Sequence, residues 1–269
     1  MHNHTAFFRF VCLSVALVFP QLHAQDAAPD AKELAARLSA NVLDGSSLVR
    51  LKMEVKKSGG EKVTLQLQVK ARRTNASSEV MYQVLWPKDR KGESFLVKKS
   101  AGGSPSGSVF VPPDAVSAIT SDKMKGGAFG SDLAYEDLVG NFFSWPQQAM
   151  VGTEVIDRVP CQILESKPGK GDHSSYSHVR SWIDMKRMVP LKIEKYSSGG
   201  QVVSRIDTTR VAEDDANRKV PASLTLQRAG QNSVTEIEGA NIRHDVSFSD
   251  ADFSVEGLRA SSASGAKTN

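Results

Sequence analysis

Short segments in which apolar and polar residues alternate recur along most of the chain, and this period of two constrains the fold most. Between Val63 and Ala71, small or apolar residues alternate with polar ones, which is typical of a strand with one buried and one solvated face. Turns rich in Gly, Pro and Ser separate this segment from others like it. The other expected strands are Leu51–Lys56, Val80–Trp86, Ser94–Lys99, Val109–Val111, Met150–Val155, Cys161–Glu165, Val179–Asp184, Val189–Tyr196, Gln201–Arg210, Ser223–Arg228 and Thr235–Ile242.

About ten short strands, with helices only at the start and in the middle, predict a mainly β protein with one antiparallel sheet. Because a sheet of this size tends to curl, we expect an unclosed antiparallel β-barrel, or half-barrel, with an apolar inner face. A helical lid should cover that face. Its two helices are expected over Asp30–Asp44, where apolar residues recur at helical spacing, and over Ser131–Val139.

The second lid helix follows a glycine-rich stretch in the middle of the chain. Gly126, Gly127 and Gly130 allow backbone angles that other residues resist, so they predict a hinge. Ser131 or Asp132 is expected to cap a short helix that starts at Leu133. By spacing alone this stretch is a structural corner.

Residues Gly130 to Leu138 read G-S-D-L-A-Y-E-D-L, and this stretch resembles the G-S-D-F-S-Y-E-D-L signature of the periplasmic outer-membrane lipoprotein-sorting (LolA-like) family. Leu133 and Ala134 depart from the signature. Weaker matches follow in the family's order, so the resemblance runs from about Val49 to Leu258 and supports the half-barrel. These matches are Gly152–Cys161 (with Arg158 at the turn glycine), Trp182–Asp184, Pro190–Lys192, Val220–Pro221 and Asp252–Ser254. The expected motif and hinge residues are Gly130, Ser131, Asp132, Tyr135, Glu136, Asp137 and Leu138.

The ends of the chain predict an exported, single-domain protein. Residues 1–24 have a basic residue, an apolar run and a small-residue cleavage site, as a secretory signal peptide does. A single domain is expected over residues 25–258 and a disordered tail over residues 259–269. We expect the mature protein to be soluble in a bacterial periplasm, because no apolar run is long enough to span a membrane.

Charge and cysteine content exclude several classes. The formal net charge of +4 comes without a basic stripe, so no nucleic-acid partner is expected. Cys12 lies in the signal segment, which leaves Cys161 as a single cysteine, expected to be buried and inert. We find no catalytic constellation and no metal or cofactor motif: of the three histidines outside the signal segment, His173, His178 and His244, the first two flank a flexible loop without a third ligand. The protein is therefore expected not to be an enzyme.

The resemblance implies a carrier that shields acyl chains of a lipoprotein or another lipid inside the barrel. It also implies a membrane transporter of the resistance-nodulation-division type as partner, and we expect the carrier to be a monomer. Asp132, Glu136 and Asp137 of the motif helix would lie at the barrel mouth; a solvated helix start is the favoured interpretation, and electrostatic steering of the partner is the alternative. The candidate cavity residues are Leu34, Leu38, Met53, Val55, Leu65, Leu67, Tyr82, Val84 and Trp86.

Two other functions stay open at this stage. A periplasmic hydrolase would need a polar cleft with His178 or His244 beside a carboxylate. A structural envelope module that binds only protein would have a filled interior. An apolar void of several hundred cubic ångströms would favour the carrier.

Overall fold

A computed structural model describes residues 30–43 and 45–264; the expected signal peptide and residues 265–269 lie outside this range. In the described part of the chain, thirteen strands form one antiparallel sheet. The strands are β1 (Gly45–Lys57), β2 (Lys62–Arg73), β3 (Ser77–Trp86), β4 (Ser94–Ser100), β5 (Ser106–Val111), β6 (Ala115–Ile119), β7 (Gln147–Ile156), β8 (Val159–Lys167), β9 (His178–Asp184), β10 (Val189–Tyr196), β11 (Val202–Glu213), β12 (Lys219–Arg228) and β13 (Ser233–His244).

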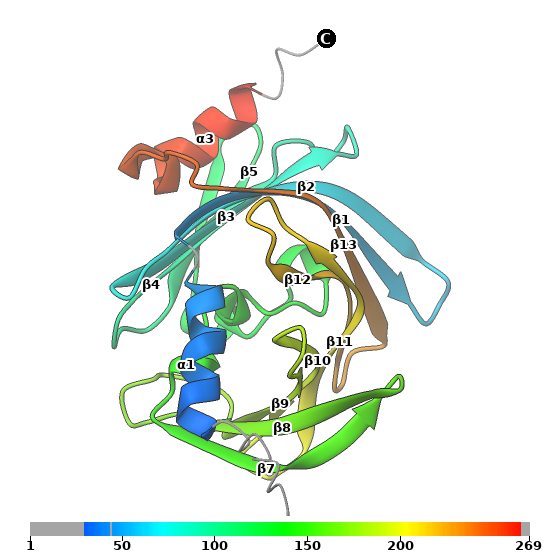
Figure 1. Ribbon diagram of the computed structural model, residues 1–269. Helices are drawn as coiled ribbons and strands as arrows, with labels where there is room; N and C mark the ends of the chain where they lie inside the picture. Colours follow the sequence, from blue (N-terminus) through cyan, green and yellow to red (C-terminus); the bar gives the residue numbers. More distant parts are fainter. Residues whose placement is uncertain (1–29, 44, 265–269) are drawn as a thin grey trace, which may run out of the picture.

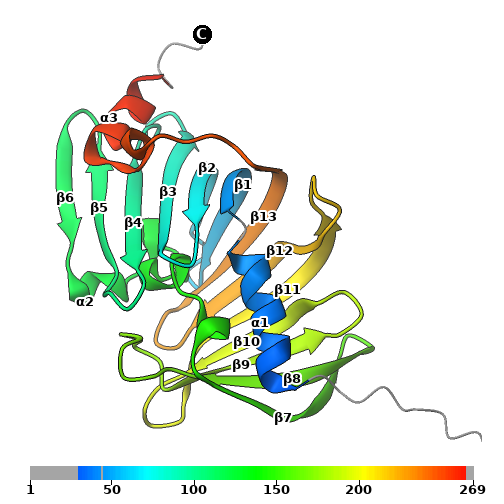
Figure 2. The ribbon, with the colours of Figure 1, turned by 60° about the vertical axis from the view of Figure 1, so that its left-hand side comes forward.

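The strand order is that of two meanders joined at one seam. Strands β6 to β1 lie side by side in reverse sequence order, β1 then pairs with β13, and β13 to β7 continue to the other edge. The sheet curls so that the edge strands β6 and β7 approach the same side without pairing (Figures 1 and 2). The prediction of an unclosed antiparallel half-barrel is therefore confirmed.

Helix α1 (Ala31–Val42) stands across the opening of the curled sheet (Figure 1). Its Leu34 and Leu38 are buried against Phe143 of the turn η3 (Phe142–Ser144) and against Leu164 and Ile183 of the sheet. The amphipathic helix was predicted, although Asp30 at its N-cap position makes no side-chain capping hydrogen bond. Packing of the apolar stripe against β8 and β9 therefore positions this helix.

The lid segment, which we define as residues 126–140, lies inside the curve of the sheet. It contains two short 3₁₀ turns, η1 (Ala128–Gly130) and η2 (Tyr135–Leu138), after the one-turn helix α2 (Ser121–Met124). The short helix expected over Ser131–Val139 is present only as the 3₁₀ turn η2 over Tyr135–Leu138, so that prediction is confirmed in part. Tertiary hydrogen bonds of the segment, described below, replace the helical ones.

The C-terminal segment covers the outer face of the sheet. The turn η4 (Asp250–Phe253) leads into helix α3 (Val255–Ser264), and Phe253 and Leu258 are buried against Met81, Leu96 and Phe110. Figure 2 shows α3 on the side of β3–β5 that faces away from the lid. The expected disordered tail from residue 259 is wrong as far as residue 264, because this helix includes those residues.

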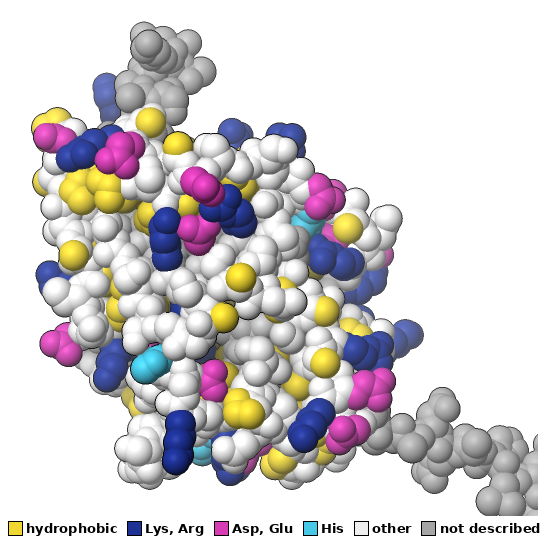
Figure 3. Space-filling model, turned by 90° about the vertical axis from the view of Figure 1, so that its left-hand side faces the viewer, with side chains coloured by type: hydrophobic (Ala, Val, Ile, Leu, Met, Phe, Trp, Pro, Cys, Tyr) yellow, Lys and Arg dark blue, Asp and Glu magenta, His cyan; other side chains and the backbone are white. Residues whose placement is uncertain are grey.

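Three further properties of the described residues bear on function. Cys161 is buried, as predicted, and burial raises the pKa of its thiol, which makes it a poor nucleophile. On the face shown in Figure 3, Lys and Arg are interspersed with Asp and Glu. None of the helices in the described part of the chain has the length and apolar character that crossing a membrane requires.

Candidate ligand-binding cavity

A cavity of about 610 Å³ lies between the lid segment and the seam of the sheet. This volume is within the range of about 300–1,000 Å³ that is usual for small-molecule sites. Six strands and the lid segment contribute to its walls, and most of the contributing side chains are apolar. The apolar lining residues are Val49, Leu51, Val69, Ala71, Tyr82, Leu133, Leu138, Ile206, Ala212, Val220, Pro221, Ala222, Leu224, Leu226, Ile237 and Ile242.

The cavity exists because the sheet splits between β12 and β13. These strands pair only between Ser223–Leu226 and Thr235–Glu238, although each strand is much longer. Beyond these pairs, β13 continues alongside β1 while β12 stays with β11. Gly239 and Ala222, the next residues beyond these pairs, are still close, since a Cβ atom at Gly239 would lie 3.4 Å from the backbone oxygen of Ala222, and both line the cavity. The diverging strands leave a volume that their side chains do not fill.

One of the nine sequence-predicted cavity residues, Tyr82, lines the cavity. Five others point to the same side of the sheet, but further along the strands, where the interior is solid. These five are Met53, Val55, Leu65, Leu67 and Val84, and they pack with Leu226 and Ile237. We call this cluster the filled end of the barrel, and the cavity its hollow end. A ligand-contacting role for these five residues stays a prediction; in the structure they form core.

The remaining three candidates lie elsewhere. Leu34 and Leu38 are buried against β8 and β9, away from the cavity lining. Trp86 is 49% exposed on the outer face. A β-bulge explains Trp86: Leu67 pairs with Val84 but Gln66 pairs with Trp86, so one extra residue of β3 reverses the alternation.

Most of the cavity wall consists of residues that were not among the predicted ones. Val49 and Leu51 lie on the same face of β1 as Met53, four and two residues before it, and Val69 lies two residues after Leu67 on the same face of β2. Period-two alternation therefore identified the inward face. The alternation in β1 and β2 could not show where along these strands the packed core ends and the cavity begins. That position depends on the separation of two other strands, β12 and β13.

Two of the three glycines that were expected to form a hinge are required by the local backbone. Gly130 has a φ of +78°, in the left-handed region that favours glycine. At Gly127 a Cβ atom would lie 1.8 Å from the backbone oxygen of Ser131, so no side chain fits there. The hydroxyl of Ser131 accepts a hydrogen bond from the amide of Leu133 at 3.2 Å. The motif therefore specifies a tight turn rather than a helix cap.

The acidic residues of the motif are anchors. Asp132 is 1% exposed and accepts hydrogen bonds from the hydroxyls of Ser233 (3.0 Å) and Thr235 (2.7 Å) on β13. Asp137 forms a buried ion pair with Lys195 of β10 at 2.6 Å between oxygen and Nζ. The prediction of a solvated acidic helix start is wrong, and the same burial removes these groups from electrostatic steering.

Glu136 completes this set of contacts. It accepts a hydrogen bond from Ser175, and burial raises the pKa of its carboxyl group. The hydroxyl of Tyr176 donates to Asp137 at 3.0 Å, and burial together with that carboxylate raises the pKa of Tyr176. The lid segment is thus tied by polar contacts to β13, to β10 and to the loop before β9.

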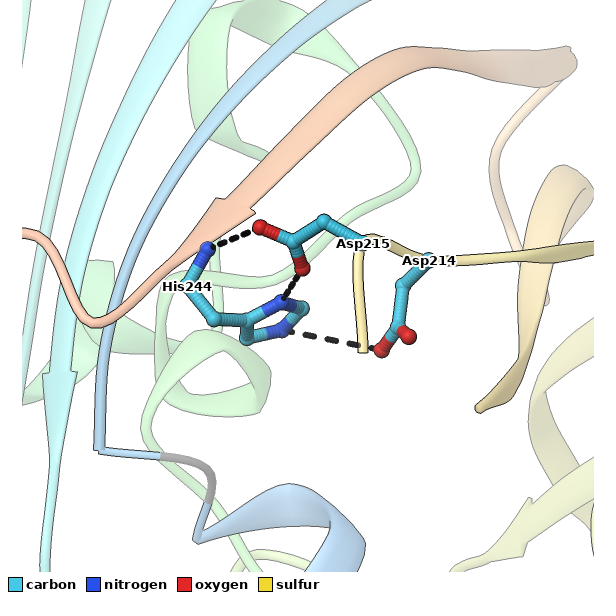
Figure 4. Close-up of side chains that lie close together, drawn as sticks. All are labelled: Asp214, Asp215 and His244. Atoms are coloured by element: carbon cyan, nitrogen blue, oxygen red, sulfur yellow. Dashed lines mark hydrogen bonds and ion pairs between the residues drawn. The ribbon is translucent and has the colours of Figure 1, made fainter. Parts of the chain in front are cut away.

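A cluster of Asp214, Asp215 and His244 bridges the far end of the split (Figure 4). The amide and Nδ1 of His244 donate to Asp215, while Asp214 accepts from Arg218 at 2.8 Å. Nη2 of Arg218 lies 2.6 Å from Nε2 of His244, and since a guanidinium only donates, that nitrogen accepts.

One potential ligand atom from each of these three residues lies within 4.8 Å of the other two, close enough for the three to share a metal ion. However, the positive charge of Arg218 lies among them and would repel a cation. The cluster therefore fits a bridge between the β11–β12 hairpin and the end of β13. It holds the two sides of the split together at the rim of the cavity.

The fold and the cavity define a class of protein: a curled antiparallel half-barrel with an apolar binding cavity beneath a lid. A protein-family model with the description "Uncharacterized protein" matches residues 76–260. The match covers more than half of the chain, so the chain belongs to that family. Its fold is LolA-like, as the solved structures below show. No curated protein matches the sequence.

Three solved structures have a similar fold. A DUF1329 family protein from Desulfovibrio piger has a TM-score of 0.77 at 23% identity, over 85% of this chain and 97% of its own. A putative outer membrane lipoprotein-sorting protein domain from Vibrio parahaemolyticus has a TM-score of 0.74 at 21% identity, over 85% and 98%. A LolA superfamily protein from Nitrosomonas europaea has a TM-score of 0.67 at 16% identity, over 86% and 100%.

Proposed function

We propose that the protein is a periplasmic carrier that shields the acyl chains of a lipoprotein or another lipid during transfer between envelope membranes. The observation that carries this proposal is the apolar cavity of about 610 Å³ at the hollow end of the barrel. Each buried methylene of an acyl chain contributes about 0.8 kcal/mol, so a chain of ~12–16 carbons gains useful affinity. The similarity in fold to a putative lipoprotein-sorting domain is consistent with such a cargo.

The direct test is mass spectrometry of organic extracts from the purified protein. The carrier predicts co-purified lipid, and a variant with the cavity blocked should lose it. Val49→Trp places an indole in the cavity, whereas Val155→Trp, at a 65% exposed position on β7, is the matched control. Equal lipid content in both variants would contradict the proposal.

A membrane transporter of the resistance-nodulation-division type is the partner that the LolA-like resemblance suggests for a monomeric carrier. The contact must be transient, since a tight complex would stall turnover. With the acids of the lid segment buried, we expect the contact at the rim of the split. Cross-linking of a residue such as Lys219 to the transporter's soluble domain tests this placement. If lipid transfer proceeds and no residue of the rim cross-links, the placement is contradicted.

A hydrolase is the second candidate, because Ser47 pairs with His244 across β1 and β13 and lines the cavity. Asp215 holds the Nδ1 side of His244, as a triad would require. Yet Nε2, the atom that would take the serine proton, accepts a hydrogen bond from Arg218. Labelling of Ser47 by a fluorophosphonate would favour the hydrolase; absence of labelling favours the carrier.

A further inference from the structure

The hollow end of the barrel contains an uncompensated positive charge. Arg73 is the last residue of β2 and lies on the inward face, two residues after Ala71 and four after Val69, all three of which line the cavity. In the described part of the chain its guanidinium has one hydrogen-bond acceptor, the carbonyl of Leu138 at 3.4 Å, and no carboxylate partner. A half-buried charge without a counter-ion is costly, so this arrangement is unusual for a position that serves only stability.

The acidic groups around the cavity do not pair with this charge, because each already has another hydrogen-bonding partner. Asp137 pairs with Lys195 and Asp214 with Arg218. Glu213 and Asp215, at the rim, pair with Lys219 and His244 respectively. The carboxylates that line the cavity are therefore already occupied within the described residues, while Arg73 is not.

Tyr82 adds a second polar group to the same wall. Its ring is fixed by stacking on Phe95 at 4.9 Å between centroids, and its hydroxyl makes no hydrogen bond within the described part of the chain. Burial raises the pKa of this hydroxyl, and the positive charge of Arg73 offsets part of the rise, which places the two groups within electrostatic reach. A guanidinium and a hydroxyl thus face one apolar chamber.

Arg210 is a second cation of the lining, but it contributes less to the argument. It is exposed, and its donors already bond to the hydroxyl of Ser223 at 3.1 Å and the carbonyl of Gly239 at 3.2 Å. Water screens such a group. Arg73 is the more enclosed of the two.

From this geometry, and resting on the proposed carrier function, we infer that the cargo is an amphiphile with an anionic group, which Arg73 and Tyr82 bind while its chain fills the apolar cavity. Guanidinium groups bind carboxylate and phosphate oxygens through paired, charge-assisted hydrogen bonds. A tyrosine hydroxyl can donate a further bond to the same oxygens. The shared chemistry of the head is therefore a carboxylate or a phosphate, as on a fatty acid or a phospholipid.

The test compares three probes with one chain length: hexadecanoate, hexadecyl phosphate and hexadecanol. Each displaces a fluorescent apolar dye from the delipidated mature protein. At least one anion should bind about tenfold or more tightly than hexadecanol, the size expected of one charge-assisted hydrogen-bond set. Preference for hexadecanoate indicates a fatty acid and preference for the phosphate a phospholipid-type head; both support the inference.

The variants separate charge from packing. Arg73→Met should remove the preference for anions while leaving hexadecanol affinity within about twofold, and Arg73→Lys should retain part of the preference. Tyr82→Phe should weaken anion binding by a few-fold. Arg50→Met is the matched control, because Arg50 is exposed, lies on β1 and does not line the cavity.

Two results would overturn the inference. Hexadecanol binding as tightly as both anions would show an apolar carrier without head recognition, and the proposed function would stand. A uniform loss of all three probes in folded Arg73→Met would assign Arg73 to packing alone. If none of the three probes binds the wild-type protein, the proposed carrier function itself fails, which is a distinct outcome.

Discussion

The two ends of the barrel interior use the same strands and the same face of the sheet, yet one is solid and the other hollow. At the filled end, Met53 faces Leu65 on one neighbouring strand and Ile237 on the other, and Ile237 in turn faces Leu224 on β12. At the hollow end, Val49 faces Val69 and Ile242, but Ile242 has no partner on β12.

The difference shows that strand pairing, rather than side-chain character, decides where this barrel holds a cavity. Val49 and Val69 are as apolar as Val55 and Val84. The filled end lies where β12 and β13 are hydrogen-bonded. The hollow end lies where they separate and borders the paired Leu224, Leu226 and Ile237, which also line the cavity. Four predictions, from the largest expected effect to the smallest, test this division.

The largest effect concerns the anchor of the lid at the hollow end. Lys195→Met leaves Asp137 buried without a cation, which should lower the free energy of unfolding by about 3–5 kcal/mol in urea denaturation. Lys56→Met removes one member of an exposed pair and should cost less than about 1 kcal/mol. The double variant Asp137→Leu with Lys195→Met should recover much of the loss. A cost equal to that of the exposed control would mean that water reaches the Asp137 site.

The second prediction compares one substitution at the two ends. Leu65→Ala removes a fully buried side chain at the filled end and should cost about 2–5 kcal/mol of unfolding free energy. Leu51→Ala enlarges an existing cavity and should cost about 1 kcal/mol, because its side chain is only partly buried and its loss exposes little new surface. Dye affinity should change for Leu51→Ala. Equal stability losses would remove the distinction between the ends.

The third prediction concerns the turn that places the lid segment. Gly127→Ala forces a Cβ against the backbone oxygen of Ser131 and should cost about 1–3 kcal/mol. In Gly130→Ala the new Cβ contacts no other atom, so the free energy of unfolding should fall by only about 1 kcal/mol, the cost of the positive φ. Thermal unfolding ranks the two variants, and lipid transfer should fall more for Gly127→Ala. The reverse ranking would show that backbone conformation matters more here than close approach.

The smallest effect belongs to the outer face, away from both ends. An ion pair with Lys70 at 2.7 Å lowers the pKa of Asp252 to about 2. Because this folded-state pKa lies below that of the unfolded chain, the stabilisation is present above about pH 4 and is lost as the pH falls toward about 2. After allowance for solvent screening, Asp252→Asn should cost about 1 kcal/mol at pH 7.

The control for this last prediction is pH itself. Urea unfolding of the wild type and Asp252→Asn should converge as the pH approaches 2, and dye binding should be equal for both proteins at pH 7. A stability gap that persists at low pH would assign the effect to the turn around Ser249 rather than to the charge.

Local pattern predicted much of the fold and little of the site. Alternation in β1 and β2 identified the inward face, because the two-residue period is a property of each strand alone. The same alternation placed Trp86 on the inward face, which is wrong. A β-bulge, visible only in the pairing of Trp86 with Gln66, turns its side chain to the outer face. The short strand β6 and the helix α3, whose residues are mostly small or polar, were also missed.

The lid segment shows why the rest was out of reach. Its glycines indicated an unusual backbone, and Gly130 has the positive φ that this requires, while a hinge movement stays a prediction. Its acids looked like helix-start residues because the first helical turn favours acids. In the structure, Thr235 and Lys195, far away in the sequence, bind these acids and fix the backbone. Arg73 became informative only once the cavity around it was known.

The single seam between β1 and β13 also governs how the chain can reach this fold. Every other strand pair joins neighbours in the chain, so both meanders can form from local contacts soon after their strands are made. The seam brings Ser47 to His244, and closing so long a loop costs entropy before any contact forms. Until that closure, β1 presents an open edge to other chains. Folding speed and aggregation should therefore depend on the last strand, although the cavity is made mostly by others.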